Sequence, residues 1–179
     1  AYALARRYKP LLINTVVVKN TDATSSIPLT LTGTSTTNQH TALIIDTSQL
    51  ASNSNIVLNN VDFAAVVGAV TITGNTAGQI ITGDLANQNV IVGTGTASQV
   101  YTGGGNDLMQ YGPSTATATT VDAKVTTALV SNSTTAGSLT AATSVLLNGG
   151  TGNDIAVFGK AQSAYSIDQR DGYVLVTDK

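Results

Sequence analysis

Residues 70–112 read VTITGNTAGQIITGDLANQNVIVGTGTASQVYTGGGNDLMQYG, and this stretch decides the fold. Short apolar groups recur in it at steps of about ten, ten and eight residues, at 80–81, 90–92, 100–101 and 108–109. A glycine-bearing turn follows each of the first three groups. Very short strands with turns at this spacing are typical of the coils of a β-solenoid, whereas the strands of a hairpin sheet usually run to about five or six residues. The spacing therefore favours an all-β fold, a parallel β-solenoid of the β-roll or β-helix type, over a hairpin sheet.

The composition of the 179-residue chain agrees with strands and excludes several other classes. The chain holds 29 Thr, 14 Ser, 14 Asn and 17 Gly but no Glu, and such an alphabet argues against a helical protein. The formal net charge of -2 leaves no basic excess to neutralise phosphates, which excludes a nucleic-acid-binding protein. The mean hydropathy of +0.17 argues against disorder, and no apolar run is long enough to span a bilayer.

The regular part of the pattern lies within residues 41–179, which we expect to form the solenoid. Residues 112–144 are rich in Thr, Ala and Ser and show no period, so they are either an insertion between coils or a patch of irregular coils. Near the end of the chain, two β-rich runs flank Asp171-Gly172, a dipeptide that favours a tight hairpin turn. Residues 163–178 are therefore predicted to form a hairpin that caps the open end of the solenoid.

Residues 1–40 differ from this pattern and are predicted to be a β-rich N-terminal arm. They hold strand-like runs at 11–18 and 27–32, separated by turns rich in Thr and Ser. Such an arm could add a strand to the open sheet edge of a neighbouring copy. We therefore expect a homo-oligomer or polymer, joined through the solenoid ends or through this arm.

Two glycine-rich segments share a motif that indicates metal binding. Residues 149–157, GGTGNDIAV, fit the pattern G-G-x-G-x-D-x-U-x, in which U is hydrophobic, and residues 102–110, TGGGNDLMQ, match it with Thr at the first position. Glycines allow a positive φ and let backbone carbonyls point inward, and Asp adds a hard anionic oxygen. Calcium prefers about six to eight oxygen ligands with tolerant geometry, so this combination favours a calcium site.

These segments resemble the calcium-binding nonapeptide repeat of RTX proteins, a class of secreted or cell-surface bacterial proteins, and the resemblance is strongest over 70–112 and 145–178. It implies Ca²⁺ bound between turns of successive coils, so that metal binding is coupled to folding. The two good copies lie 47 residues apart, so a site shared between them requires that they stack as neighbours. The implied metal-site residues are Gly103, Gly105, Asp107, Gly150, Gly152 and Asp154, with Asp84 as a further candidate from a turn that keeps less of the motif.

No enzyme motif accompanies these turns. His40 is the one histidine of the chain and lies in a polar, turn-like context, so a surface position is expected for it. The chain has no G-x-S-x-G nucleophile elbow, and its glycines are not followed by a helical pattern that could bind a phosphate or a dinucleotide. We therefore expect no catalytic residue and no enzyme activity.

The sequence thus favours a non-enzymatic, calcium-stabilised structural module of a secreted or cell-surface protein, such as a surface-layer, adhesin or filament subunit. The alternative is an accessory module for calcium binding and export, attached to a secreted enzyme whose catalytic domain lies elsewhere. A polysaccharide partner is a third option, against which the scarcity of aromatic residues counts. The chain begins without Met and shows no signal peptide, so we expect a processed form or a fragment, located outside the cell or at its surface and exported without an N-terminal signal.

Overall fold

The computed structural model describes residues 9–19, 27–93, 98–112, 119–123, 128–131, 145–170 and 173–178. In these residues the regular structure is β-strand, apart from the short 3-10 helix η1 (Gln162–Ala164). The prediction of an all-β fold is therefore confirmed. No helix in the described part of the chain is long and apolar enough to cross a membrane.

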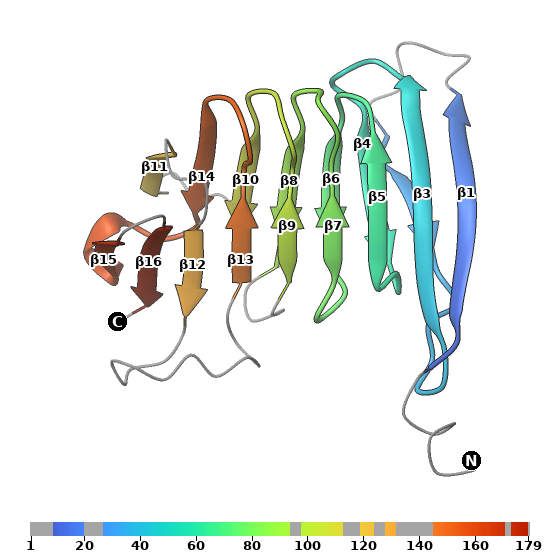
Figure 1. Ribbon diagram of the computed structural model, residues 1–179, viewed down its shortest axis with the longest axis horizontal. Helices are drawn as coiled ribbons and strands as arrows, with labels where there is room; N and C mark the ends of the chain where they lie inside the picture. Colours follow the sequence, from blue (N-terminus) through green and yellow to red (C-terminus); the bar gives the residue numbers. More distant parts are fainter. Residues whose placement is uncertain are drawn as a thin grey trace.

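The strands form two sheets (Figure 1). The nine-stranded sheet contains, in spatial order, β1 (Leu11–Lys19), β3 (His40–Gln49), β5 (Phe63–Val67), β7 (Ile80–Thr82), β9 (Gln99–Tyr101), β13 (Val145–Asn148), β12 (Ala128–Ser131), β16 (Tyr173–Asp178) and β15 (Tyr165–Arg170). The seven-stranded sheet contains, in spatial order, β11 (Thr119–Ala123), β14 (Asp154–Phe158), β10 (Leu108–Tyr111), β8 (Asn89–Val92), β6 (Thr71–Gly74), β4 (Asn55–Asn59) and β2 (Leu29–Thr32).

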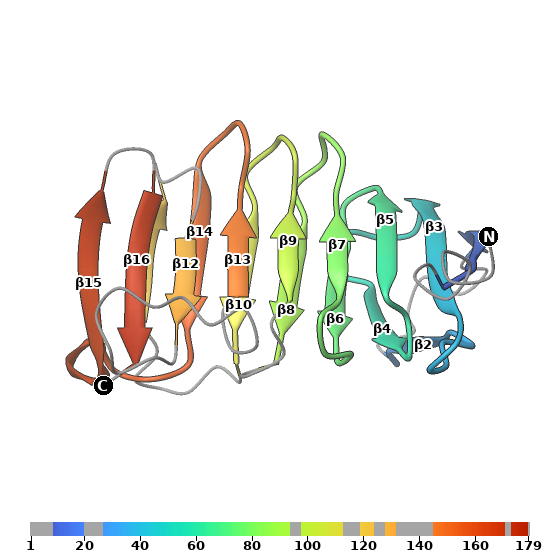
Figure 2. The same ribbon diagram turned by 60° about the horizontal axis from the view of Figure 1, so that its bottom comes forward.

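Successive strands from β1 to β10 alternate between the two sheets. Each odd-numbered strand pairs in parallel with the next odd-numbered strand, and each even-numbered strand pairs in parallel with the next even-numbered one. One passage of the chain through both sheets, here called a coil, therefore advances the stack by one strand in each sheet. Figure 2 shows the resulting row of strands, with the turns between sheets gathered along its edges.

The core lies between the two sheets, because every second side chain of a strand points into the space between them. The parallel register aligns these inward positions from one coil to the next, which produces columns of buried apolar side chains. Each fully buried aliphatic side chain contributes about 1.5–3 kcal/mol to stability. One column, from the seven-stranded sheet, contains Ile56, Ile72, Val90, Met109 and Ala156, and another, from the nine-stranded sheet, contains Leu43, Ala64, Ile81, Val100 and Leu147.

The chain leaves this stack after β10 and returns to it at β13. Strand β13 pairs in parallel with β9, and β14 pairs in parallel with β10, as in the earlier coils. The described strands of the intervening segment, β11 and β12, lie beyond this last coil and pair antiparallel with β14 and β13. The segment therefore interrupts the order of the strands along the sequence, but β9 still pairs with β13 and β10 with β14.

The expected N-terminal arm is not separate from the sheets in its described parts. Strand β1 pairs in parallel with β3, from Leu11 opposite His40 to Val17 opposite Asp46, and β2 pairs in parallel with β4. The boundary expected at residue 40 therefore does not coincide with a change of strand pairing, because the β-branched residues of β1 fit the register of β3. Residues 1–8 and 20–26 of that arm lie outside the described residues.

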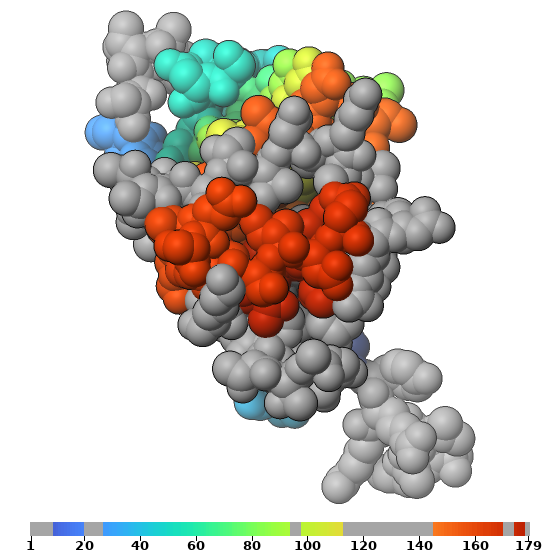
Figure 3. Space-filling model, turned by 90° about the vertical axis from the view of Figure 1, so that its left-hand side faces the viewer, coloured from blue at the N-terminus to red at the C-terminus, as the bar shows by residue number. Residues whose placement is uncertain are grey.

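Strands β15 and β16 form an antiparallel pair at the opposite end of the nine-stranded sheet. Tyr165 and Val176 are buried with Phe158, and the ring centroids of Tyr165 and Phe158 lie 5.7 Å apart. Figure 3 looks onto this end, where the described residues after 145, coloured orange to red, lie across the middle of the face. The pair thus packs against the apolar core, while the Asp171-Gly172 turn predicted between its strands lies outside the described residues.

Candidate functional site

The two glycine-rich turns lie directly beside each other, although 47 residues separate them in sequence. The pairing of β9 with β13 and of β10 with β14 places residues 102–107 alongside residues 149–154, position by position. Between the strands, Gly104 and Thr151 form a parallel bridge, and the Thr151 N–H donates to the Gly103 carbonyl at 2.9 Å. The stacking that a shared site requires is therefore present.

Glycine is required in these turns because the backbones of the two coils touch. Gly150 and Gly152 have positive φ values of 77° and 135°, which L-residues rarely adopt. A Cβ at Gly150 would lie 1.9 Å from the Gly103 carbonyl oxygen, and one at Gly152 would lie 1.5 Å from the Gly105 carbonyl oxygen. The glycines of the motif thus allow one turn to rest on the backbone of the next.

The carboxylates of Asp107 and Asp154 hold neighbouring coils together. Both side chains are buried, with 2% of each residue exposed. Asp107 Oδ1 accepts a hydrogen bond from the Gln88 N–H at 2.8 Å, and Asp154 Oδ1 accepts one from the Asp107 N–H at 3.0 Å. Each carboxylate therefore fixes the backbone of the preceding coil, at the point where a turn becomes a strand of the seven-stranded sheet.

The second oxygen of Asp107 is the exception in this arrangement. Asp107 Oδ2 is buried and has no hydrogen-bond partner among the described residues. Burial raises the pKa of Asp107, the nearby Thr102 hydroxyl and the Gln88 N–H lower it, and the adjacent Asp154 carboxylate raises it further. A buried carboxylate with an unpaired oxygen beside a second carboxylate is costly unless a proton or a cation compensates its charge.

Two further oxygen atoms, of Thr102 and Gly149, lie near this carboxylate pair. The Thr102 hydroxyl is buried and lies 3.2 Å from the Gly149 carbonyl oxygen. The Asp154 carboxylate packs against Gly149, where a Cβ would lie 2.2 Å from Asp154 Oδ2. Carboxylate, hydroxyl and carbonyl oxygens form the donor set of a hard cation such as Ca²⁺. Among the described residues no three acidic, His or Cys side chains gather in one place, so the remaining ligands would have to be backbone, hydroxyl or water oxygens.

Asp84, the further candidate from the sequence, does not join this pair. The register places Asp84 alongside Gly103, whereas the counterpart of Asp107 in that turn is Gln88. The Asp84 carboxylate accepts hydrogen bonds from the Gly68 N–H at 3.0 Å, from the Ala86 N–H at 2.9 Å and from the Gln88 side-chain amide. It therefore stabilises its own turn and the preceding coil.

Sequence reasoning missed a ladder of asparagines along the same edge. The Asn106 N–H donates to Asn87 Oδ1 at 2.8 Å, and the Asn153 N–H donates to Asn106 Oδ1 at 2.9 Å. Each Asn precedes the residue at the Asp107 position of its coil. The signal in the sequence was the dipeptide Asn-Gln or Asn-Asp that recurs at 87–88, 106–107 and 153–154.

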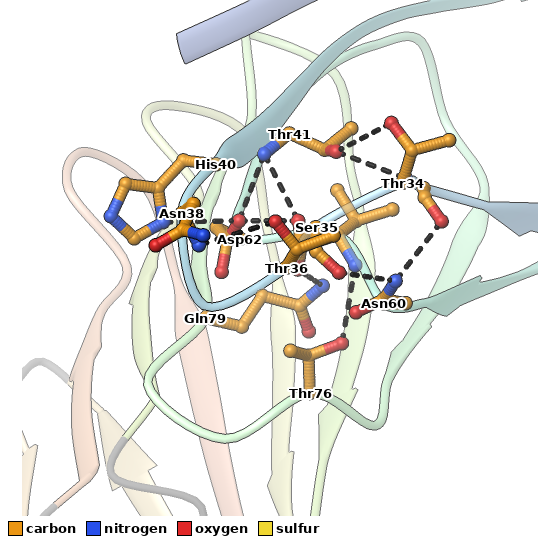
Figure 4. Close-up of polar contacts among 12 residues, drawn as sticks. Thr34, Ser35, Thr36, Asn38, His40, Thr41, Asn60, Asp62, Thr76 and Gln79 are labelled. Carbon is orange, nitrogen blue, oxygen red and sulfur yellow. Dashed lines mark hydrogen bonds and ion pairs between the residues drawn. The ribbon is translucent and has the colours of Figure 1, made fainter. Parts of the chain in front are cut away.

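A second polar cluster surrounds Asp62, near the start of β3 and β5 (Figure 4). Asp62 Oδ2 accepts hydrogen bonds from the Ser35 hydroxyl and from the Thr41 N–H at 2.8 Å, and it lies 3.2 Å from His40 Nδ1. His40 is thus half-buried and has an acidic partner, whereas the sequence indicated a plain surface residue. Because Ser35 contacts the carboxylate and not the imidazole, the cluster lacks the nucleophile-to-base hydrogen bond of a catalytic triad.

The Asp62 cluster predicts a loss of stability in acid. Burial alone would raise the pKa of Asp62, but the hydrogen bonds from Ser35, Thr41 and His40 outweigh it and hold the pKa below its ordinary value. Its stabilising effect is therefore present above the unfolded-state pKa and is lost as the pH falls through the folded-state pKa. We expect Asp62→Asn to cost about 1–2 kcal/mol of unfolding free energy at pH 7 and less at pH 3, measured by urea denaturation.

The comparison for this prediction is Asp46→Asn, at an exposed carboxylate that accepts a hydrogen bond from the N–H of Ser48, two residues further on. The contacts with Ser48 also lower the pKa of Asp46, but solvent screens an exposed carboxylate, so the loss of stability should be smaller than for Asp62→Asn. An Asp62→Asn deficit that stays the same from pH 7 to pH 3 would contradict the assigned role of the carboxylate charge.

Comparison with known proteins identifies no family or function for this chain. No protein-family model matches the chain, and neither a curated protein nor a solved structure is significantly similar to it. The proposals for its function therefore rest on the stacked glycine-rich turns and on the two sheets that position them.

Proposed function

We propose that the chain is a non-enzymatic, calcium-stabilised structural module of a secreted or cell-surface protein of the RTX type. The observation that carries the proposal is the in-register contact of two glycine-rich turns around the buried pair Asp107 and Asp154. One oxygen of Asp107 in that pair has no hydrogen-bond partner among the described residues, and no ion pair of these residues involves either carboxylate, which supports a bound cation as the compensating charge.

We also propose that the two sheets form a parallel β-solenoid. The alternation of strands between the sheets and the parallel pairing within them support it. The antiparallel strands β15 and β16 would serve as its cap at one end. In this arrangement the turns that lead from the nine-stranded to the seven-stranded sheet lie along one edge, so that the two turns that carry the motif become neighbours, as a shared metal-binding site needs.

The residues of this chain that would hold the cation are the carboxylates of Asp107 and Asp154, with the Thr102 hydroxyl and the carbonyl of Gly149 beside them. When bound, Ca²⁺ would supply the positive charge that the carboxylate pair lacks. The backbone N–H groups of Gln88 and Asp107 already orient one oxygen of each carboxylate. Calcium would therefore tie the last coil to the one before it and couple binding to folding.

A structural role follows from the same contacts. The carboxylates of Asp107 and Asp154 accept hydrogen bonds from backbone N–H groups of the neighbouring coil. In the cluster of Ser35, Asp62 and His40, the Ser hydroxyl contacts the carboxylate and not the imidazole, unlike the arrangement in a catalytic triad. A calcium-dependent stack would suit a place outside the cell, where calcium reaches millimolar levels and extracellular modules bind it at about 10⁻⁴–10⁻³ M. We accordingly propose a self-assembling surface or filament subunit.

The test is a calcium titration of the chelated chain, followed by far-UV circular dichroism and by the urea midpoint, with magnesium as the control. We expect a gain of β signal and of stability with Ca²⁺ at micromolar to millimolar concentration, and not with Mg²⁺. Asp154→Asn should abolish the response, whereas the matched variant Asp84→Asn should keep it. A chain that is fully folded in chelator and indifferent to calcium would overturn the proposal.

A further inference from the structure

The two end strands of the nine-stranded sheet each have a described neighbour on one side. Strand β1 pairs with β3, and β15 pairs with β16, at opposite ends of the sheet (Figures 1 and 2). The backbone groups on the outer side of an edge strand are a template for pairing with another strand. These two strands are therefore the places where the sheet could continue into another molecule.

The two end strands run in the same direction. Parallel pairings connect β1 through β3, β5, β7 and β9 to β13. The direction reverses from β13 to β12, stays the same to β16 and reverses again to β15, as Figure 2 shows. Strand β15 therefore points the same way as β13 and, through the parallel pairings, the same way as β1. A second copy shifted along the sheet, without being turned over, would place its β1 beside β15 in the parallel orientation of the main stack.

Apolar side chains on the core side are exposed at both ends. Leu12 lies opposite the buried Thr41 and is 39% exposed, and Ile167 lies opposite the buried Val176 and is 37% exposed. At the β1 end there is a groove whose lining is mostly apolar, with Val18, Ile27, Pro28, Leu29, Leu50 and Ile56, and includes the polar residues Lys19, Ser54 and Asn55. Contact between the two ends would continue the core as well as the sheet and remove this apolar surface from water.

Most of strand β1 is apolar and uncharged. Its residues 11–18, LLINTVVV, contain no charged side chain, and Leu11, Ile13 and Val17 are exposed on its outer face. Lys, Pro and bulges are features that keep a natural edge strand free, and here they occur only at the two ends of the strand, as Lys9-Pro10 before it and as Lys19 with a register shift at its end, so the middle of β1 can still pair with another strand. On a second copy, β15 ends the same sheet, runs in the same direction as β1 and has an exposed core-side apolar residue, Ile167.

We propose that copies of this chain join head to tail, with β1 of one copy pairing in parallel with β15 of the next. The contact uses different surfaces on the two partners, so each added copy leaves one β1 edge and one β15 edge open, and the assembly grows as a filament. This inference deepens the proposed structural role and rests on it, but the interface can be tested separately from the metal.

The test uses one Lys variant at each end of the full chain and a matched control. Leu12→Lys and Ile167→Lys place a charge on the core side of β1 and β15, and Leu85→Lys places one in the turn between β7 and β8, where the side chain is 84% exposed. Sedimentation velocity in calcium should give a concentration-dependent series of oligomers for the natural chain and for Leu85→Lys. Each end variant alone should remain a monomer.

The decisive sample is an equimolar mixture of the two end variants. Each retains the edge that the other lacks, so the mixture should form a dimer and nothing larger. A backbone variant, Ile13→Pro, should behave like Leu12→Lys. The Pro10 carbonyl accepts from the His40 N–H on the β3 side, so the alternation of the strand places the Ile13 N–H on the free side. Circular dichroism of every variant checks that the fold is retained.

Three results would overturn the interface: a natural chain that stays monomeric, end variants that assemble as it does, or a mixture that forms no dimer. The calcium titration of the same samples separates the two proposals. A chain that responds to calcium but stays monomeric overturns the interface alone, and a chain that assembles without responding to calcium overturns the metal site alone.

Discussion

The Gly152→Ala chain is expected to lose the contact between its two glycine-rich turns and at least about 3 kcal/mol of unfolding free energy. The added Cβ would lie 1.5 Å from the Gly105 carbonyl oxygen and 2.7 Å from its carbon, so backbone and not a flexible side chain must move. The φ of 135° is also one that Ala does not adopt without strain. Urea denaturation in calcium measures the loss, and the calcium response should weaken with it.

The matched control is Gly78→Ala. Gly78 also has a positive φ, of 71°, but a Cβ there would have no atom within 4 Å. This variant should lose only the unfolding free energy that corresponds to backbone strain, about 1–2 kcal/mol for a non-glycine residue in the left-handed conformation. The difference between the two variants therefore combines the contact between coils with the greater backbone strain of Ala at a φ of 135°. Equal losses would show that the turns do not rest on each other.

The local sequence pattern was enough to predict the strands, because strand formation here depends on residues that are close together in the sequence. β-Branched and apolar pairs such as Ile80-Ile81 recur between glycine-bearing turns, and inward and outward positions alternate along each strand. The same reasoning identified the turns that contain Asp107 and Asp154. It did not reveal the cluster around Asp62, since a carboxylate 21 residues from its Thr41 donor leaves no periodic signal.

The sequence did not reveal the register of the irregular turn at 83–88. It offered Gly83-Asp84 as the best remnant of the motif in this turn, whereas strand pairing on both sides of the turn places Gln88 at the Asp107 position. Sequence spacing alone also could not show that residues 102–107 and 149–154 are neighbours. That contact forms because β13 and β14 pair with β9 and β10 after the intervening segment. This pairing joins residues that are far apart in the sequence, so local spacing does not reveal it.

Without calcium, the pH dependence of the Asp107 contribution is expected to run opposite to that of Asp62. The folded-state pKa of Asp107 is raised, chiefly by burial, so the folded chain binds this proton more tightly than the unfolded chain does. Ionised Asp107 therefore destabilises the calcium-free fold above the folded-state pKa, and its penalty fades as the pH falls through that pKa toward the unfolded value. Calcium should cancel the penalty at neutral pH, because the cation replaces the proton as the compensating charge.

Asp107→Asn tests this argument with little change of shape. The amide keeps an oxygen that can accept from the Gln88 N–H, and it removes the charge on the oxygen that has no partner among the described residues. In chelator at pH 7 the variant should be more stable than the natural chain by about 1–3 kcal/mol, and the gap should close toward pH 4. In saturating calcium the order should reverse, since the variant has lost a ligand. A variant that is less stable than the natural chain in chelator at every pH would mean that the Asp107 charge is already compensated within the protein, and the case for a cation at this edge would fall with that result.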